Sequence, residues 1–325
     1  MKKKVNGLAF CALLFAVSFP VEAQQAAKIS RIGYLDAGTA SGSAVLLEAF
    51  RQELGKLGWT VGKNITIEYR FAEGKSERLP ELAAELVHLK VDVIVGASTT
   101  SALAVKSATT TIPVVMVNVS DPVGVGLVAS LPRPGGNVTG LASLAPELNT
   151  KRLEILKDAV PKLLRVGLLW LSGGGTGQDL QMKELGPAAL ALKLKLEEIE
   201  TQPDPKDLES AFRTAKQKQV GAIMTTANRP FFAERKRIVE LAGKYRLPAI
   251  YPGKEFVDEG DGVDTTDLYQ RAAHYVDKIL KGIKPADLPV QQATKFEFVI
   301  NLKAAKQIGL TIPIDLLAKA NKVLQ

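Results

Sequence analysis

The stretch VDVIVGASTTSALAVKSATTTIPVVMVNV, residues 91–119, decides the fold class. It begins with an apolar run of strand length at 91–96 and ends with another at 113–119, and residues 97–108 between them suit a helix. Two strands joined through a helix run parallel, because a crossover returns the chain to the same end of the sheet. Runs this apolar predict central strands covered by helices on both faces. The stretch therefore predicts an α/β fold.

The same alternation continues in both directions along the chain. Upstream it predicts strands at 31–36 and 65–71, a helix over 43–58, and a second helix capped by Ser76. Downstream it predicts strands at 165–171, 194–200, 221–227 and 247–251, with helices over 149–160, 179–193, 204–218 and 231–245. Four or five strands in each half predict two Rossmann-like lobes with parallel sheets, joined by a hinge.

The last part of the chain is expected to return and complete the lobes. Its pattern predicts helices over 267–289 and a strand over 296–301. We place residues 28–141 and about 265–301 in lobe 1, and about 142–264 and 302–325 in lobe 2.

The first 23 residues have the composition of a cleaved export signal. Three lysines precede an apolar run over 8–20, which is too short to span a bilayer. Val21 and Ala23 then supply small residues at the positions that signal peptidase reads, so we expect cleavage after Ala23. Phe10 stands where a lipid anchor at Cys11 would want a small residue. Cys11 is the only cysteine, so cleavage leaves a chain without thiols or disulfides. These features predict export to a bacterial periplasm.

Charge and motifs argue against several classes of function. The net charge of +8 becomes +6 once three lysines and one glutamate leave with the signal. The densest basic run, at 234–246, is mixed with acidic residues and lacks interleaved aromatics, so no nucleic-acid partner is expected. His88 and His274 have no histidine or cysteine nearby, so no metal site is expected. The loop SGGGTG at 172–177 lacks the lysine of a nucleotide loop. We therefore expect no cofactor and no catalytic residue, although a carboxylate pair set by the fold stays possible in principle.

Residues 121–140, DPVGVGLVASLPRPGGNVTG, contain a glycine pattern that resembles a dinucleotide-binding turn. That turn normally follows the first strand of its fold, and here it follows roughly the fourth. Asp121 would also place a negative charge near a pyrophosphate. We instead expect Asp121 to cap a short helix over 122–131, with the glycines allowing close backbone approach.

Several long phrases carry a family resemblance, among them DPVGVGLVASLPRPGGNVTGL (121–141), RLEILKDAVP (152–161) and YRLPAIYPGKEFVDEG (245–260). With residues 275–313 they make residues 28–325 resemble the exported substrate-binding proteins of ABC transporters, in the group with tryptophan- and phenylalanine-binding members. The resemblance implies a type I periplasmic binding protein, whose lobes are joined by three crossovers and close on a small molecule. It implies a permease of the inner membrane as partner, no enzymatic activity, and a monomer, as is usual in the family.

The candidate ligand contacts lie where the predicted strands end. Parallel α/β sheets bind ligands at the carboxyl ends of their strands, beside helix N-termini. The candidates combine hydroxyls for a carboxylate, aromatics for a flat group, and amides or acids for polar groups. Each aromatic has core packing as its alternative role, and Asp121 has helix capping. They are Tyr34, Asp36, Ser41, Ser98, Thr99, Asn118, Asp121, Trp170, Ser172, Thr176, Asn228, Phe231, Tyr251 and Asp264.

One segment departs from the family pattern. Many relatives carry a Gly-Gly-Leu-x-Ser-Tyr-Gly stretch where this chain has the shorter DGVDTTDLY at 261–269. The ligand of the aromatic-amino-acid binders therefore does not carry over directly: the candidate loops suit a small polar or amphipathic molecule, amino-acid-like or aromatic, and Asp264 near that place suggests a cationic or hydroxyl-rich ligand. Two other outputs stay open: a soluble sensor that presents its ligand to a membrane receptor, and a secreted enzyme using cleft carboxylates.

Overall fold

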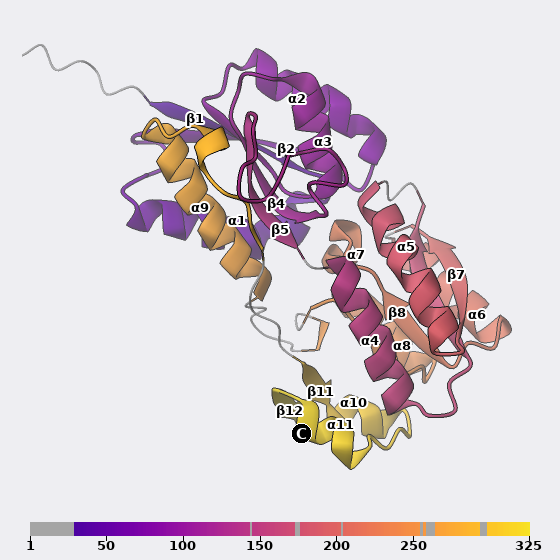
Figure 1. The fold of residues 1–325 in the computed structure, drawn as a ribbon. Helices are drawn as coiled ribbons and strands as arrows, with labels where there is room; N and C mark the ends of the chain where they lie inside the picture. The colour runs from indigo at the N-terminus through magenta and orange to yellow at the C-terminus, as the bar shows by residue number, and fades with distance from the viewer. Residues whose placement is uncertain are drawn as a thin grey trace, which may run out of the picture.

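The computed structural model describes residues 29–143, 145–172, 176–202, 204–253, 256–257, 264–292 and 298–325. The predicted export signal, residues 1–23, lies outside this described part. Figure 1 shows two α/β lobes, with a small C-terminal unit beside the second lobe. Across the described ranges, every helix is too short or too polar to cross a membrane.

The first lobe is built on a six-stranded sheet in which every pairing is parallel. The order across the sheet is β10-β5-β4-β3-β1-β2. The order places β1 between β3 and β2, as crossover connections allow. The strands are β1 (Ser30–Asp36), β2 (Ile65–Phe71), β3 (Val93–Gly96), β4 (Val114–Ser120), β5 (Val138–Ser143) and β10 (Gln291–Gln292).

Helices cover both faces of this sheet, and side chains of β1 enter the core on each face. Ile32 and Tyr34 pack into the core beneath α1 and α9, while Leu35 packs into the core beneath α2 and α3. Helix α9 comes from far along the sequence, yet it lies beside α1 (Figure 1). The helices are α1 (Ala40–Lys56), α2 (Leu79–His88), α3 (Thr99–Ala108) and α9 (Asp264–Leu280), with 3₁₀ turns η1 (Ser76–Arg78) and η3 (Pro285–Asp287).

The second lobe has a four-stranded parallel sheet in the order β7-β6-β8-β9. Its strands are β6 (Arg165–Leu171), β7 (Lys195–Thr201), β8 (Ala222–Thr225) and β9 (Ala249–Ile250). Cores lie on both of its faces, so the expected pair of doubly covered parallel sheets is confirmed. The helices are α4 (Ala145–Ala159), α5 (Thr176–Ala191), α6 (Pro205–Gln217), α7 (Arg229–Ala233) and α8 (Arg235–Lys244).

The C-terminal unit consists of β11 (Val299–Asn301), α10 (Leu302–Gln307), α11 (Ile314–Lys319) and β12 (Lys322–Leu324). Strands β11 and β12 pair with each other as a separate two-stranded sheet, and α11 packs against α4 of the second lobe. The strand expected over 296–301 thus forms at 299–301, and its partner is β12 rather than the first sheet.

The helix expected over 122–131 does not form; the chain makes turns there. Asp121 accepts a hydrogen bond from the Gly124 backbone N–H (2.8 Å), so it caps a turn and not a helix. Gly126 takes a φ of 72°, which an α-helix cannot contain. Strand β5, which was not predicted, follows directly. It contains Gly140 at a φ of 134°, where a Cβ would overlap the Met116 carbonyl oxygen of β4.

Two further boundaries differ from the predicted ones. Ser76 opens the 3₁₀ turn η1 and does not cap α2, which begins at Leu79 after Arg78 without a side-chain cap. The helix expected over 231–245 is divided at Glu234 into α7 and α8. The division turns the short α7 toward the first lobe, where it contacts α1.

Candidate ligand-binding cleft

A cleft lies between the two lobes, at the carboxyl ends of the strands of both sheets. It leaves about 620 Å³ free of protein atoms, part of it open to solvent. The first lobe contributes Ala37, Ser76, Ser98, Thr99, Thr100, Asn118, Ser120 and Ser143 to its lining, and the second contributes Leu171, Gln178, Gln181, Ala227, Asn228, Pro230 and Phe232. Among the described residues, no charged side chain lines the cleft. The polar groups of the lining are hydroxyls and amides, and one aromatic ring lies beside them.

The first lobe presents hydroxyls at the start of α3. Ser98 is the N-cap residue, and its Oγ accepts from the Ser101 backbone N–H (3.1 Å). Thr99 Oγ1 accepts from the Ser120 backbone N–H (3.1 Å), which ties the helix start to the end of β4. Ser120 in turn lies within 3.3 Å of Ser143 Oγ at the end of β5. Three neighbouring strand ends are thereby joined into one polar wall, next to the positive end of the α3 dipole.

Asn118 projects from the same wall at an irregular point of β4. The pairing of β4 with β5 shifts register between Met116 and Val119, which marks a β-bulge. Asn118 lies inside that shift with a φ of 58°, a left-handed conformation that asparagine tolerates better than most side chains. The bulge displaces Asn118 from the regular alternation of the strand and brings it to the cleft lining.

The second lobe presents two glutamines whose amides are held by the backbone. Gln178 Nε2 donates to the Leu171 carbonyl (2.9 Å), and Gln178 Oε1 accepts from the Leu171 N–H (3.2 Å). Gln181, one helical turn on, forms the same pair with Ala227, at 3.1 Å to its carbonyl and 2.9 Å from its N–H. Both glutamines are 2 % exposed. They tie α5 to the ends of β6 and β8 and fix the shape of this wall.

A half-buried cation supports the glutamine wall from behind. Arg152 donates to Asn149 Oδ1 (2.6 Å) and to the Pro252 carbonyl (2.9 Å), and Asn149 donates to Gln181 Oε1 (2.9 Å). Burial lowers the pKa of the Arg152 guanidinium to about 10, because the charged form loses hydration there. Within the described ranges Arg152 has no carboxylate partner, and its guanidinium donates only to neutral oxygens.

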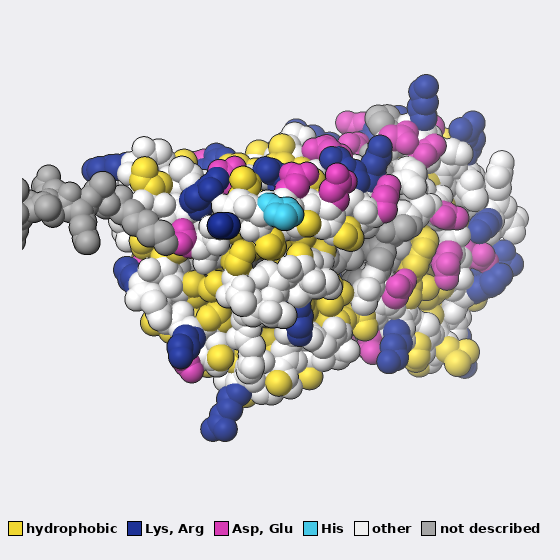
Figure 2. Space-filling view, turned by 90° about the horizontal axis from the view of Figure 1, so that it is seen from above, with side chains coloured by type: hydrophobic (Ala, Val, Ile, Leu, Met, Phe, Trp, Pro, Cys, Tyr) yellow, Lys and Arg dark blue, Asp and Glu magenta, His cyan; other side chains and the backbone are white. Residues whose placement is uncertain are grey.

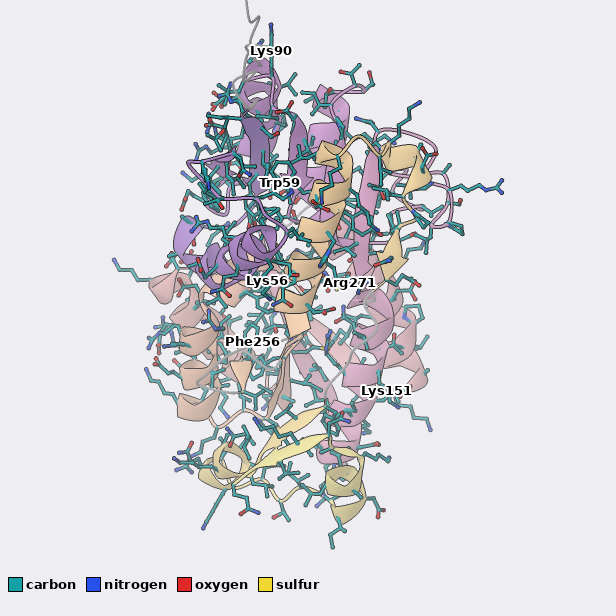
Figure 3. All side chains as sticks on the ribbon, turned by 90° about the vertical axis from the view of Figure 1, so that its left-hand side faces the viewer. Lys56, Trp59, Lys90, Lys151, Phe256 and Arg271 are labelled. Atoms are coloured by element: carbon teal, nitrogen blue, oxygen red, sulfur yellow. The ribbon has the colours of Figure 1, made fainter. Side chains whose placement is uncertain are left out.

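Aromatic rings reach the cleft from the second lobe. Phe232 lines it and meets Phe256 edge-on, with ring centroids 5.2 Å apart. Phe256 stacks on Tyr251 at 4.9 Å, and Figure 3 shows Phe256 in the second lobe. Burial raises the pKa of the Tyr251 hydroxyl, which therefore stays protonated. The rings form a continuous ladder whose end at Phe232 faces the cleft.

The structure brings four of the predicted contacts together in the cleft: Ser98, Thr99, Asn118 and Asn228. Asp121 does not line the cleft; it lines a second cavity with Glu184 and Gln292, and Ser143 belongs to the lining of both. Tyr251 stands one ring behind the cleft surface.

The other predicted contacts are placed elsewhere. Tyr34, Asp36 and Phe231 are fully buried, and Asp36 accepts from Tyr34 (3.1 Å), Ser43 (2.7 Å) and the Gly38 N–H (2.9 Å). Trp170 packs against the core of the second lobe, and Ser172 donates to Glu200 (2.5 Å). Ser41 and Thr176 are exposed outside the lining. Asp264 begins α9, but its side chain, like residues 173–175 and 258–263, lies outside the described residues.

Several lining residues were not predicted. Phe232 is one position after the predicted Phe231, and a helical reading of 229–233 would have placed the two rings on different faces. Gln178 and Gln181 are spaced three apart at the start of a helix that follows a strand, which does put both on one face. The sequence carries no sign that their amides bind backbone groups.

The lobes approach each other beside the cleft, where α1 contacts α7. A Cβ placed on Gly42 would lie 2.7 Å from the Cβ of Ala233, so only glycine fits this contact. Away from the cleft the surface is mixed in charge. On the face shown in Figure 2, lysine and arginine side chains alternate with aspartate and glutamate, and no broad area of one sign appears.

Comparisons with known proteins agree with this geometry. The model of a family described as ABC transporter substrate binding protein matches residues 43–324. A tyrosine-binding protein of Clostridioides difficile strain R20291 is 26% identical over 269 residues, which cover 81% of this chain and 76% of that protein.

Solved structures are similar over almost the whole chain. A conserved domain protein from Vibrio cholerae is 29% identical with a TM-score of 0.80, covering 91% of this chain and 100% of its own. An ABC domain from Streptococcus pneumoniae in complex with L-Trp is 27% identical with a TM-score of 0.78, covering 91% and 99%. The resemblance inferred from the sequence phrases is confirmed.

Proposed function

The chain belongs to the family of ABC transporter substrate-binding proteins, and from this premise we propose that it captures an aromatic α-amino acid between its lobes. The observation that carries the proposal is the lining of the cleft. The first lobe contributes hydroxyls and the second mainly amides, one aromatic ring borders them, and no described side chain in the lining is charged. Such a lining suits a zwitterion, which has strong hydrogen-bonding groups and little net charge.

The ligands of two similar proteins support an aromatic amino acid. One similar protein is named for tyrosine binding, and one similar structure holds L-Trp. Phe232 offers the matching surface, because a ring at the end of the Phe256–Tyr251 ladder can pack against a ligand ring. The hydroxyls at the start of α3, beside the positive end of the helix, suit the ligand carboxylate.

The proposed output is delivery rather than chemistry. The open protein would admit the amino acid, and contacts from both lobes would favour the closed arrangement, in which Gly42 meets Ala233. The closed form would then dock on a permease of the inner membrane. The composition of residues 1–23 supports export to the periplasm for this role. We assign no enzymatic step to the chain.

A thermal-shift screen tests the proposal. The purified protein is denatured and refolded to remove carried-over ligand, then melted with amino acids, aromatic acids, purines, vitamins and sugars. At a hundred times its Kd, tryptophan, tyrosine or phenylalanine should add about 2.7 kcal/mol, or about 5 °C. Stabilisation by a sugar or purine alone, or by no member of the panel, would contradict the proposal.

Phe232→Leu sharpens the result. The variant keeps apolar volume but loses the ring, so the preference for an aromatic amino acid over leucine should fall by about three- to tenfold. Phe71→Leu is the matched control, since Phe71 belongs to a ring cluster with Tyr34 inside the first lobe and does not line the cleft. An equal loss of preference in both variants would remove Phe232 from the proposed site.

A further inference from the structure

Asn118 brings an unused amide to the cleft from the first lobe. Its side chain lines the cleft and makes no hydrogen bond anywhere in the described part of the chain. Its backbone stands at a φ of 58° within the bulge of β4. Backbone held in this sparsely populated region recurs at ligand sites, where the surrounding structure enforces it. The fold thus maintains an irregular strand whose visible result is a free amide facing the cleft.

Asn228 brings a second amide from the opposite lobe. It occupies the N-cap position of α7, where an asparagine oxygen normally accepts from the helix backbone, yet it makes no capping bond. Its Nδ2 donates instead to Gln178 Oε1 (3.1 Å). The Leu171 backbone fixes the orientation of the Gln178 amide, because the Leu171 N–H donates to Gln178 Oε1 and the Leu171 carbonyl accepts from Gln178 Nε2. Asn228 must therefore turn its NH₂ to Gln178, and its Oδ1 accepts no hydrogen bond from any described residue.

The two amides supply what the rest of the lining lacks. The hydroxyls of Ser98, Thr99, Thr100, Ser120 and Ser143 bond to one another or to backbone groups. Ser76 adds one further neutral hydroxyl, and the described lining contains no carboxylate that would meet a cation. We propose that Asn118 Oδ1 and Asn228 Oδ1 accept hydrogen bonds from the ammonium group of one bound amino acid, so that each lobe holds the same group. This inference rests on the proposed function, because it names the contacts within the same cleft.

The bridge also links recognition to closure. A group held from one lobe alone gives no preference for the closed arrangement, whereas a group held from both lobes binds the closed form more tightly. Removing either oxygen breaks the bridge, and removing the second then costs little more. The effects of the two substitutions should therefore be less than additive.

The test is a cycle that varies both protein and ligand. Isothermal titration compares L-tyrosine with 3-(4-hydroxyphenyl)propanoate, which lacks only the ammonium group. Asn118→Gly keeps the left-handed backbone and removes the amide, and Asn228→Ser keeps a good N-cap residue. Each should weaken tyrosine about tenfold, as expected for losing a hydrogen bond to a charged group, and leave the propanoate within about twofold. The double variant should lose far less than a hundredfold.

Two further variants keep the proposal falsifiable. Asn118→Asp retains a residue that tolerates the left-handed backbone and adds a negative charge, so tyrosine should bind at least as tightly and the propanoate should be rejected. Gln219→Gly is the control, because Gln219 has the same backbone conformation (φ 55°) outside the cleft lining. Gln219→Gly should change the affinity for neither L-tyrosine nor the propanoate.

The outcomes separate the two proposals. If the unmodified protein binds no amino acid, the proposed function fails first. If it binds tyrosine and the asparagine variants weaken both ligands equally, or neither, the bridge is wrong while the function stands. Strictly multiplicative losses in the double variant would also overturn it.

Discussion

The two lobes share one architecture but prepare their halves of the cleft differently. The first lobe presents hydroxyls and an asparagine on a bulged strand, and its Asn118 amide has no hydrogen-bond partner among the described residues. The second presents amides already tied to strand ends by paired hydrogen bonds, with Arg152 behind them. The first lobe therefore keeps an amide with unused hydrogen-bonding groups, whereas most amide groups of the second lobe are used in its own structure. Two lobes with similar sheets can thus differ in which one offers free polar groups and which one is held more rigidly.

The largest expected effect concerns a glycine on which the first lobe depends. Gly140→Ala places a Cβ against the Met116 carbonyl oxygen at a φ of 134°, so backbone must move. We expect a loss of about 3 kcal/mol or more in the free energy of unfolding, measured by urea denaturation.

Gly167→Ala on β6 is the counterpart in the second lobe. The new Cβ there would lie 2.9 Å from Ile223 Cδ1, the end of a flexible side chain, and the backbone φ is ordinary. Its loss should be about 1 kcal/mol, the lower end for overpacking a core. Equal losses in the two variants would show that the bulged strand places no special demand on the first lobe.

The second prediction concerns the contact between the two lobes. Gly42→Leu puts a side chain where α1 meets Ala233 of α7, so the lobes can no longer approach as they do here. Ligand affinity should fall by tenfold or more, because the closed arrangement is disfavoured. X-ray scattering should show no compaction when ligand is added.

Gly55→Leu is the matched control on the same helix. A Cβ at Gly55 meets nothing within 4 Å, so this variant gains the same side chain without touching the second lobe. It should bind and compact like the unmodified protein. Normal compaction of the Gly42 variant would mean that this contact does not limit closure.

The smallest expected effect is on the pH dependence of the melting temperature. It comes from one carboxylate in each lobe that connects two helices. In the second lobe Glu209 of α6 accepts from Lys244 (2.7 Å) and Tyr245 (2.7 Å), and these bonds hold its pKa below the ordinary 4.5. A depressed carboxyl pKa adds stability above the unfolded value, and that stability disappears as the pH falls through the folded value. Glu209→Gln should therefore lower the melting temperature slightly near neutral pH and hardly at all in acid.

Glu53 of α1 offers the comparison in the first lobe. Its pKa is lowered mainly by the hydrogen bond from Lys56 on the same helix, with His274 of α9 adding to it. The bond from Lys56 lies within one helix, so it adds less to the tertiary structure than the bonds of Glu209 do. Glu53→Gln should therefore reduce the fall of the melting temperature between neutral and acid pH less than Glu209→Gln does. A larger reduction for Glu53→Gln would contradict this comparison.

The sequence predicted the regular elements well because their physics is local. Strands at 65–71 and 165–171 form with those bounds, since alternating or continuous apolar runs need only a sheet to join. Strand β5 was missed because its role depends on a bulge in β4 and on the close approach at Gly140, which are tertiary facts.

The cleft was harder to predict for the same reason. Ser98 could be placed at a helix start from its neighbours alone, and the structure puts it in the lining. Phe232 and Gln178 depend on where a helix begins, which sequence patterns give only to within a few residues. A one-residue error exchanged the cleft-facing ring for the buried Phe231.

The placement of Trp59 and Trp170 gives each lobe its own intrinsic fluorophore. These are the only two tryptophans of the sequence. Trp59, labelled in Figure 3, donates to Asp277 in the first lobe (2.8 Å), and Trp170 packs against the core of the second. Replacing either one by phenylalanine leaves a protein whose emission reports a single lobe. Comparing the unfolding transitions of the two variants by tryptophan fluorescence then shows whether the lobes unfold together or one before the other, without an added dye.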